Sequence, residues 1–304
     1  MKVAVTGATG VIGSALVREL RAREDEVTAL SRNAARARAT LGIEAVAWER
    51  PKSEPPPEEA LRGRDGVVNL LGEALAQRWT EETKREIRDS RILGTRNLVA
   101  ALAELPDGER PRVLVSQSAV GWYGARGDEP LDESEPPGSG FEAQTAVAWE
   151  AEARRAEELG VRVVTTRTGV YLSQTGGALE TMLPPFRLGV GGPAAGGRQY
   201  VPWVHLDDVV GALAFCLRTE AASGPVNVTA PEPVTNRDFS KALGRVLRRP
   251  AVLPVPALAL NVLYGEMSVL VTTGRRAVPA RLLELGYEFR RPDLEDALRE
   301  ATGR

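Results

Sequence analysis

Short runs of β-branched and other apolar residues alternate along the chain with longer segments whose apolar positions recur every three or four residues. The short runs predict strands at residues 3–6, 27–31, 45–48, 67–71, 113–116, 161–166 and 226–229. The longer segments predict helices at residues 12–23, 57–62, 81–105, 144–159 and 206–217. Strands that are apolar at nearly every position and are separated by helices indicate a parallel sheet covered on both faces. The pattern therefore predicts an α/β fold with a doubly wound parallel sheet of the Rossmann type.

This alternation loosens after residue 170, where glycines become frequent, and prolines space the apolar segments beyond residue 230. Residues 206–217 and 226–229 nevertheless continue the Rossmann pattern. We therefore expect a dinucleotide-binding core at residues 1–170, completed by about 202–230. Residues 171–201 and 231–304 are expected to form a smaller, interleaved C-terminal substrate lobe.

The amino-acid composition argues against several classes of binding partner. The 39 Lys and Arg nearly cancel the 41 Asp and Glu, a net charge of −2 that gives no basic footprint for nucleic acid. One cysteine and one histidine cannot form an internal disulfide or a His-based metal site. There is no apolar run of the roughly 20 residues that a membrane span needs, and no signal-peptide pattern. We expect a cytoplasmic protein with a small-molecule substrate, no nucleic-acid partner, no membrane partner and no bound metal; the sequence leaves its oligomeric state open.

A glycine loop follows the first predicted strand and opens the first predicted helix. Residues 6–13 read TGATGVIG, in which Gly7 suits a tight turn, Gly10 lets backbone approach a pyrophosphate, and Gly13 lets the helix pack on the strand. Amide groups at a helix N-terminus and the helix dipole favour an anion there. The alternative is a plain strand–helix turn. We expect a cofactor-binding loop that also includes Thr9, Val11 and Ile12.

The end of the second strand indicates which dinucleotide binds. An NAD enzyme normally has an Asp or Glu there to hold the ribose 2′-hydroxyl, but this chain has Ser31 and Arg32. An arginine fork and a hydroxyl suit a 2′-phosphate. The alternative is a solvated arginine on a loop. The sequence favours NADP as the cofactor.

Several strings spread over the whole chain carry a family resemblance. They read VNLLGE at 68–73, RWT at 78–80, SAVGWYG at 118–124, RTGV at 167–170, PPFRLG at 184–189 and WVH at 203–205. The chain resembles the extended short-chain dehydrogenase/reductase family, and more closely its epimerase-family branch of nucleoside-diphosphate-sugar epimerases. The resemblance implies a Rossmann fold, a nicotinamide cofactor and redox or epimerase chemistry.

The catalytic residues implied by this resemblance are only partly present. In the parent family a Ser or Thr after the fifth strand acts with a Tyr and with a Lys four residues beyond it; the Tyr is the acid/base and the Lys lowers its pKa. Ser118 matches the first position, but residues 141–150 contain neither Tyr nor Lys. Tyr123 and Lys84 are substitute candidates, with a packed aromatic as the alternative for Tyr123. His205 is a further candidate proton carrier, with a role in starting a helix as its alternative.

The predicted helix at 81–105 carries cations on an apolar face. Lys84, Ile87 and Arg91 fall at spacings of three or four residues, so the two cations are drawn toward the sheet. An inward cation needs an anion, and a cofactor phosphate would supply it. Glu86 is expected to pair with Arg91 or to accept a hydrogen bond from the adenosine. The alternative is a solvated basic face.

Ligands of open α/β sheets bind at the carboxyl ends of the strands. Further cofactor contacts are therefore expected at the ends of the fourth and sixth strands, from Leu70, Leu71 and Gly72 and from Thr168, Gly169, Val170 and Tyr171. Two functions remain open. One is an NADP-dependent oxidoreductase or epimerase that acts on a small polar substrate, for example a nucleotide sugar. The other is a catalytically silent NADP(H)-binding sensor or regulatory module, which the missing Tyr and Lys favour.

Overall fold

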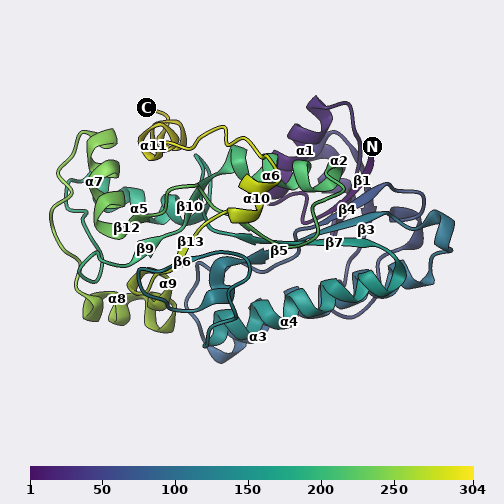
Figure 1. Cartoon of the computed structure of the whole chain (residues 1–304), viewed down its shortest axis with the longest axis horizontal. Helices are drawn as coiled ribbons and strands as arrows, with labels where there is room; N and C mark the ends of the chain where they lie inside the picture. Colours follow the sequence, from purple (N-terminus) through teal and green to yellow (C-terminus); the bar gives the residue numbers. More distant parts are fainter.

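The computed structural model describes all residues, 1–304, and contains a seven-stranded parallel sheet in the order β11-β7-β5-β4-β1-β2-β3. All seven predicted strands are in this sheet (Figure 1). The bounds are β1 (Lys2–Thr6), β2 (Glu26–Ser31), β3 (Glu44–Ala47), β4 (Gly66–Asn69), β5 (Val113–Ala119), β7 (Arg162–Thr168) and β11 (Gly224–Val228). The predicted doubly wound α/β fold is therefore confirmed.

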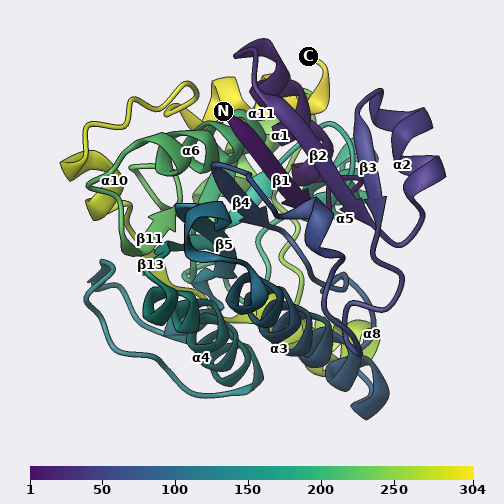
Figure 2. The same ribbon diagram turned by 90° about the vertical axis from the view of Figure 1, so that its right-hand side faces the viewer.

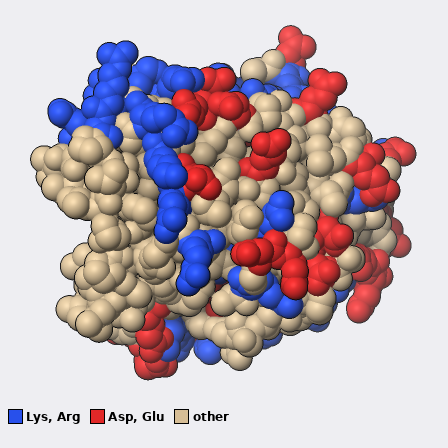
Figure 3. Space-filling view, turned by 60° about the vertical axis from the view of Figure 1, so that its left-hand side comes forward, with Lys and Arg blue, Asp and Glu red and all other residues tan.

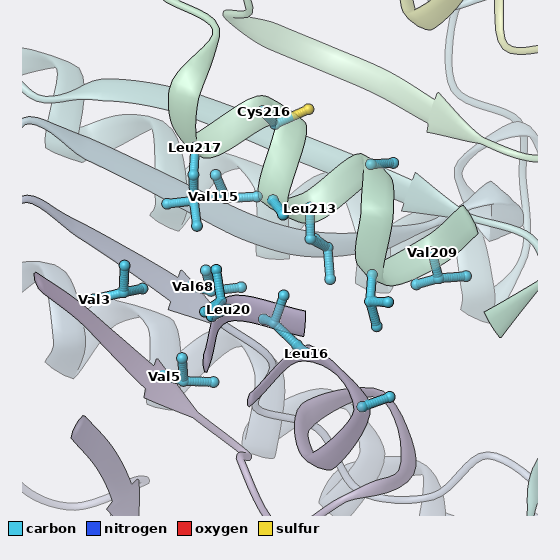
Figure 4. Close-up of a cluster of buried hydrophobic side chains, with 14 of the residues drawn as sticks. Val3, Val5, Leu16, Leu20, Val68, Val115, Val209, Leu213, Cys216 and Leu217 are labelled. Carbon is cyan, nitrogen blue, oxygen red and sulfur yellow. The ribbon is translucent and has the colours of Figure 1, made fainter. Parts of the chain in front are cut away.

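Helices cover both faces of the sheet (Figure 2). One face carries α1 (Val11–Ala22), α2 (Ala34–Leu41) and α6 (Leu206–Arg218), and the other carries α3 (Glu81–Glu104) and α4 (Phe141–Arg154). Figure 4 shows side chains of α1 and α6, Leu16 and Leu213 among them, packed against Val5, Val68 and Val115 of the strands. This burial on both faces is what makes the strands apolar at nearly every position.

One predicted helix needs correction, and one helix that packs on the sheet was not predicted. Residues 57–62 form only a short 3-10 turn at Glu58–Ala60, because the segment is bounded by three prolines at 55–57 and by Gly63, which has a φ of +67°. Helix α2 was not predicted, since its eight residues are mostly alanine and arginine and bury only Ala37.

A second layer of short elements lies beyond the carboxyl ends of the strands. Its hydrophobic cluster is separate from those of the sheet and includes Leu183, Trp203, Phe239 and Leu298. The elements are β6 (Pro130–Leu131), β8 (Val170–Leu172), α5 (Gly177–Arg187), β9 (Tyr200–Val201), β10 (Trp203–His205), β12 (Val234–Thr235), α7 (Asn236–Leu247), α8 (Ala257–Tyr264), α9 (Val269–Thr272), β13 (Arg276–Ala277), α10 (Ala280–Glu284) and α11 (Leu294–Thr302). None of the helices combines the length and apolar character that crossing a bilayer requires.

Within this second layer, two strand pairs join distant parts of the chain. Strand β13 pairs with β6, and β10 pairs with β8 directly after the sheet strand β7. The proposed division of the chain into a core and an interleaved lobe stays a prediction. The arrangement does put C-terminal residues next to the strand ends, where a ligand of this fold class binds.

Candidate functional site

The glycine loop leads from β1 into α1 and leaves one position open. Gly7 has a φ of +64°, and a Cβ there would lie 2.6 Å from the Leu70 carbonyl oxygen. A Cβ at Gly13 would overlap the backbone of Gly7 and Ala8, so this glycine allows α1 to pack on β1. At Gly10, the N-cap of α1, a Cβ would meet only Gly7 O, at 3.3 Å. A group outside the chain can therefore approach the backbone at Gly10.

The local electrostatics of the same loop favour binding of an anion. The first turn of α1 contains no acidic residue, so nothing in it neutralises the partial positive charge at the helix N-terminus. Thr9 and Gly10 are exposed, while Val11 and Ile12 are half-buried. These features fit the pyrophosphate of a dinucleotide.

The end of β2 presents a hydroxyl and a cation. Ser31 Oγ accepts a hydrogen bond from Asn33 N at 3.2 Å, and Asn33 in turn caps α2. Arg32 lies exposed between them. There is no carboxylate at the end of this strand, whereas NAD-binding proteins have an Asp or Glu there that binds the ribose 2′-hydroxyl.

A buried polar network joins the strand ends to the helices below them. Asn69 Oδ1 accepts from Thr6 Oγ1 at 2.9 Å, and Asn69 Nδ2 donates to Thr95 Oγ1 at 2.9 Å. Thr95 Oγ1 also accepts from Trp149 Nε1 at 2.9 Å. This network fixes the ends of β1 and β4 relative to α3 and α4. The sequence analysis missed Asn69, Thr95 and Trp149; polar residues within otherwise apolar strand and helix faces were the available signal.

A pocket opens between α3, α4 and the end of β5. Its lining residues with polar or charged side chains are Arg91, Glu142 and Thr145. The other lining residues are Leu75, Ile87, Ala119, Gly121, Phe141, Ala146 and Trp149. The hollow is small, about 30 Å³, and its walls are mostly apolar.

Comparison with known proteins decides the family. The profile of the NAD dependent epimerase/dehydratase family matches residues 3–229, and a domain of unknown function, DUF1731, matches residues 255–301. The chain belongs to the NAD dependent epimerase/dehydratase family. It is 38% identical over 299 residues to the epimerase family protein YfhF of Bacillus subtilis, covering 98% of this chain and 97% of that protein.

Human and mycobacterial proteins of the same family are also similar along their whole length. An epimerase family protein of Mycobacterium tuberculosis, MT2273, is 42% identical over 306 residues, covering 99% of this chain and 98% of that protein. The crystal structure of human epimerase family protein SDR39U1 (isoform 2) with NADPH has a TM-score of 0.88 and 34% identity. That comparison covers 100% of this chain and 99% of the human one.

The family's Tyr and Lys have no equivalents on α4 of this chain. The α4 residues that line the pocket include Thr145 and Trp149, and none of them is a Tyr or a Lys. An aliphatic hydroxyl titrates far above neutral pH and an indole N–H is only a donor, so neither is an acid/base at pH 7. The epimerase-family mechanism that uses a Tyr–Lys pair therefore cannot operate from this helix.

Ser118 does not face the pocket, although it matches the family's Ser position. Its Oγ donates to Glu150 Oε1 at 2.7 Å, and its side chain is buried against α4. The next residue, Ala119, which ends β5, lines the pocket instead. The hydrogen bond to Glu150 favours a structural role for Ser118 over the catalytic role expected from sequence.

Tyr123 is also held in the interior. It is fully buried, and its hydroxyl lies 2.8 Å from Asn227 Oδ1 and 2.9 Å from Asp132 O. Burial raises the pKa of the Tyr123 hydroxyl to about 12. A phenol that is harder to ionise and has no access to the pocket is a poor acid/base. The packed-aromatic alternative fits these contacts better than catalysis.

Lys84 and Glu86 both turn away from the pocket. Lys84 Nζ lies 2.9 Å from Glu266 Oε2, an ion pair between the start of α3 and the C-terminal lobe, and it also pairs with Glu81. The Glu86 carboxylate pairs with Lys52 at 2.6 Å rather than with Arg91. The inward orientation expected of the α3 cations therefore holds for Arg91 and not for Lys84.

The residues that follow β4 and β7, at the carboxyl ends of these strands, are packed tightly against neighbouring residues. Leu70 N donates to Thr6 Oγ1 at 2.9 Å, Leu71 packs against Gly94, and Gly72 lies against the Arg91 guanidinium. Beyond β7, Thr168 is buried, and a Cβ at Gly169 would overlap the Pro202 carbonyl.

Val170 and Tyr171 continue into β8, where Tyr171 is half-buried against Gly177 and burial raises the pKa of its hydroxyl. His205, which follows in β10, has its Nδ1 accepting from Asp207 N at the start of α6 and its Nε2 2.6 Å from Glu300 Oε2. The helix-starting role is therefore the one these contacts support.

Proposed function

We propose that this chain binds NADP(H) and acts as an oxidoreductase or epimerase on a small polar substrate. The observation that carries the proposal is the accessible backbone at Gly10, at the N-terminus of a helix without first-turn acids. The human relative SDR39U1 was solved with NADPH, which supports the same cofactor here.

In this proposal Gly10 and its neighbours hold the pyrophosphate, and Ser31 with Arg32 holds the 2′-phosphate. The backbone of residues 70–72 then contacts the adenosine half of the cofactor. Residues 168–171 contact its nicotinamide half. The bound cofactor supplies the hydride. The chain contributes the Thr145 hydroxyl, which has no hydrogen-bond partner within the protein and is available to orient a substrate oxygen.

A silent NADP(H) sensor is the second candidate, favoured by the absence of Tyr and Lys from residues 141–150. The test is NADPH oxidation with a panel of aldehydes, ketones and nucleotide sugars. Turnover of any panel member that is lost when Thr145 is replaced by valine supports the enzyme. Tight NADPH binding without turnover of any of them supports the sensor.

We further propose that the partner is a small molecule rather than nucleic acid or a membrane. The net charge of −2 gives no overall excess of positive charge for a polyanion. Figure 3 shows Lys and Arg gathered from the upper left to the centre of one face, with Asp and Glu next to them at the centre and at the right.

Replacing Arg32 by alanine is expected to remove the preference for NADPH. Loss of a charge-assisted hydrogen bond to the 2′-phosphate costs about 1.5–3 kcal/mol, which corresponds to a tenfold or greater loss of NADPH affinity. NADH affinity stays unchanged because NADH lacks this phosphate. Tryptophan fluorescence titrations with both cofactors measure the effect. Arg50→Ala, which removes an exposed arginine that is paired with Glu54, is the control; an unchanged preference in Arg32→Ala contradicts the assignment.

A further inference from the structure

Helix α8 presents an apolar stripe to solvent. Its sequence, ALALNVLY, contains no charged residue, and Leu260 is its one buried residue. Leu258 and Val262 are each 74% exposed, and Leu263 is 65% exposed. A helix that is apolar on nearly all sides is normally buried, so the single chain leaves α8 only half covered.

Helical periodicity collects the exposed side chains of α8 on one side. Leu258 and Val262 are four residues apart, as are Ala259 and Leu263, so the four residues form two adjacent rows. Rows of residues four apart are the ridges with which packed helices interdigitate. The small Ala259 beside the bulky row leaves a groove for a ridge of another helix. The stripe therefore has the form of a helix-packing surface.

The apolar surface extends beyond α8 without a charged side chain. Four more large apolar side chains are exposed in the adjoining segments: Leu188, Val190, Val252 and Leu253. These two segments are adjacent, because a Cβ at Gly189 would lie 3.5 Å from the Pro250 side chain. Neither residues 188–197 nor residues 250–265 include Asp, Glu, Lys or Arg. We call the stripe of α8 together with these four residues the α8 face.

The α8 face concentrates the exposed apolar side chains of the whole protein. Seven of the ten large apolar side chains that are exposed belong to it. Figure 1 shows α8 at the outer edge of the second layer, at the lower left and away from the sheet. Apolar side chains that are scattered singly over a surface need no explanation, whereas a contiguous group of this kind marks an interaction site.

The exposed area of the chain is large enough to supply a stable interface. Its accessible surface is 13809 Å² at a mass of 32.7 kDa. A compact monomer of this mass exposes about 12,400 Å², so the chain has an excess of about 1,400 Å². A dimer interface of standard size covers about 800 Å² on each partner. The chain can therefore bury the area that a stable dimer needs and still expose as much surface as a compact monomer.

A second copy of this chain is the partner that fits these features. A two-fold axis brings the same patch of both copies together, so the patch must be complementary to itself. An uncharged face meets its own copy without repulsion between like charges, and its two rows interdigitate with the same two rows. A lipid surface fits less well, because helices that lie on membranes carry Lys and Arg on their polar face, and α8 has neither.

We propose that the chain forms a homodimer in which α8 packs against α8 of the second copy across a two-fold axis. Leu188, Val190, Val252 and Leu253 surround this contact and complete the interface. The proposal does not depend on a cofactor, so its failure and the failure of the proposed function are distinguishable.

Sedimentation equilibrium at micromolar protein concentration tests the proposal. We expect the wild type to have twice the chain mass of 32.7 kDa. The double variant Leu258→Glu, Val262→Glu brings four carboxylates together at the two-fold axis and should raise the dissociation constant at least a hundredfold. Leu283→Glu is the matched control, because Leu283 is also an exposed leucine but lies on α10; this variant should dimerise as the wild type does.

Four results overturn the proposal. The wild type sediments at the chain mass, or the folded double variant dimerises as tightly as the wild type, or Leu283→Glu dissociates as far as the double variant does. The fourth result is a monomeric wild type that sediments with phosphatidylserine vesicles while the double variant does not, which would assign the α8 face to a lipid surface. Circular dichroism verifies folding, and Leu258→Asn replaces the double variant if that protein does not fold.

Discussion

Gly10→Val abolishes NADPH binding and leaves the protein folded. A Cβ at this position meets only Gly7 O, at 3.3 Å, so a shift of that backbone by a few tenths of an ångström accommodates the first atom of a side chain. The two methyl groups extend into the space that a pyrophosphate needs. Exchanging glycine for valine at a helix N-cap costs about 1 kcal/mol, which a domain of this size tolerates.

Circular dichroism and a fluorescence titration with NADPH measure both parts of this prediction. Gly13→Val is the contrasting variant, because a side chain there overlaps the backbone of Gly7 and Ala8. We expect Gly13→Val to lower the free energy of unfolding, rather than to remove a specific contact to the cofactor. A Gly10→Val protein with a native spectrum and normal NADPH affinity would show that the loop does not hold the pyrophosphate.

Glu150→Ala destabilises the protein by about 3–5 kcal/mol, because it leaves a buried charge without a partner. Glu150 and Arg167 are each 3% exposed, and Arg167 Nε and Nη2 donate to the two carboxylate oxygens, one each. The same substitution removes the acceptor of the Ser118 hydroxyl. Arg167 also lies over the Trp122 ring at 3.8 Å, so the unpaired cation cannot leave without disturbing the packing.

Urea denaturation gives the free energy of unfolding for this variant. Arg96→Ala removes a partner of Glu152 from an exposed pair on the neighbouring helix and should change stability by less than about 1 kcal/mol. The double variant Glu150→Ala, Arg167→Met should recover much of the loss, since it contains no unpaired buried charge. Equal stability of Glu150→Ala and the wild type would mean that this ion pair does not hold β5, α4 and β7 together.

The sheet was predictable because its signal is local and repeated. Each strand is a short apolar run that is followed by a helix, and a parallel sheet buried on both faces requires that pattern. The short pairs β9 with β12 and β6 with β13 were not predictable. They have two residues per strand and join segments that are far apart in the sequence.

Part of the candidate site was predictable for the same reason. The glycine loop is local, so the need for Gly7, Gly10 and Gly13 follows from spacing alone, and the inward direction of Arg91 follows from helical periodicity. The roles of Ser118 and Glu86 depend on contacts with distant residues. Ser118 contacts Glu150 on the following helix, and Glu86 contacts Lys52 in a surface loop. Sequence spacing contains no information about either contact.

The central claim is that the chain holds NADP(H) through its glycine loop and the Ser31–Arg32 end of β2. Isothermal titration of the wild-type protein with NADPH and with NADH, in one buffer, tests it most directly. The account predicts one site per chain and an NADPH affinity at least tenfold higher than that for NADH. Equal affinities, or no binding of either dinucleotide, would contradict it.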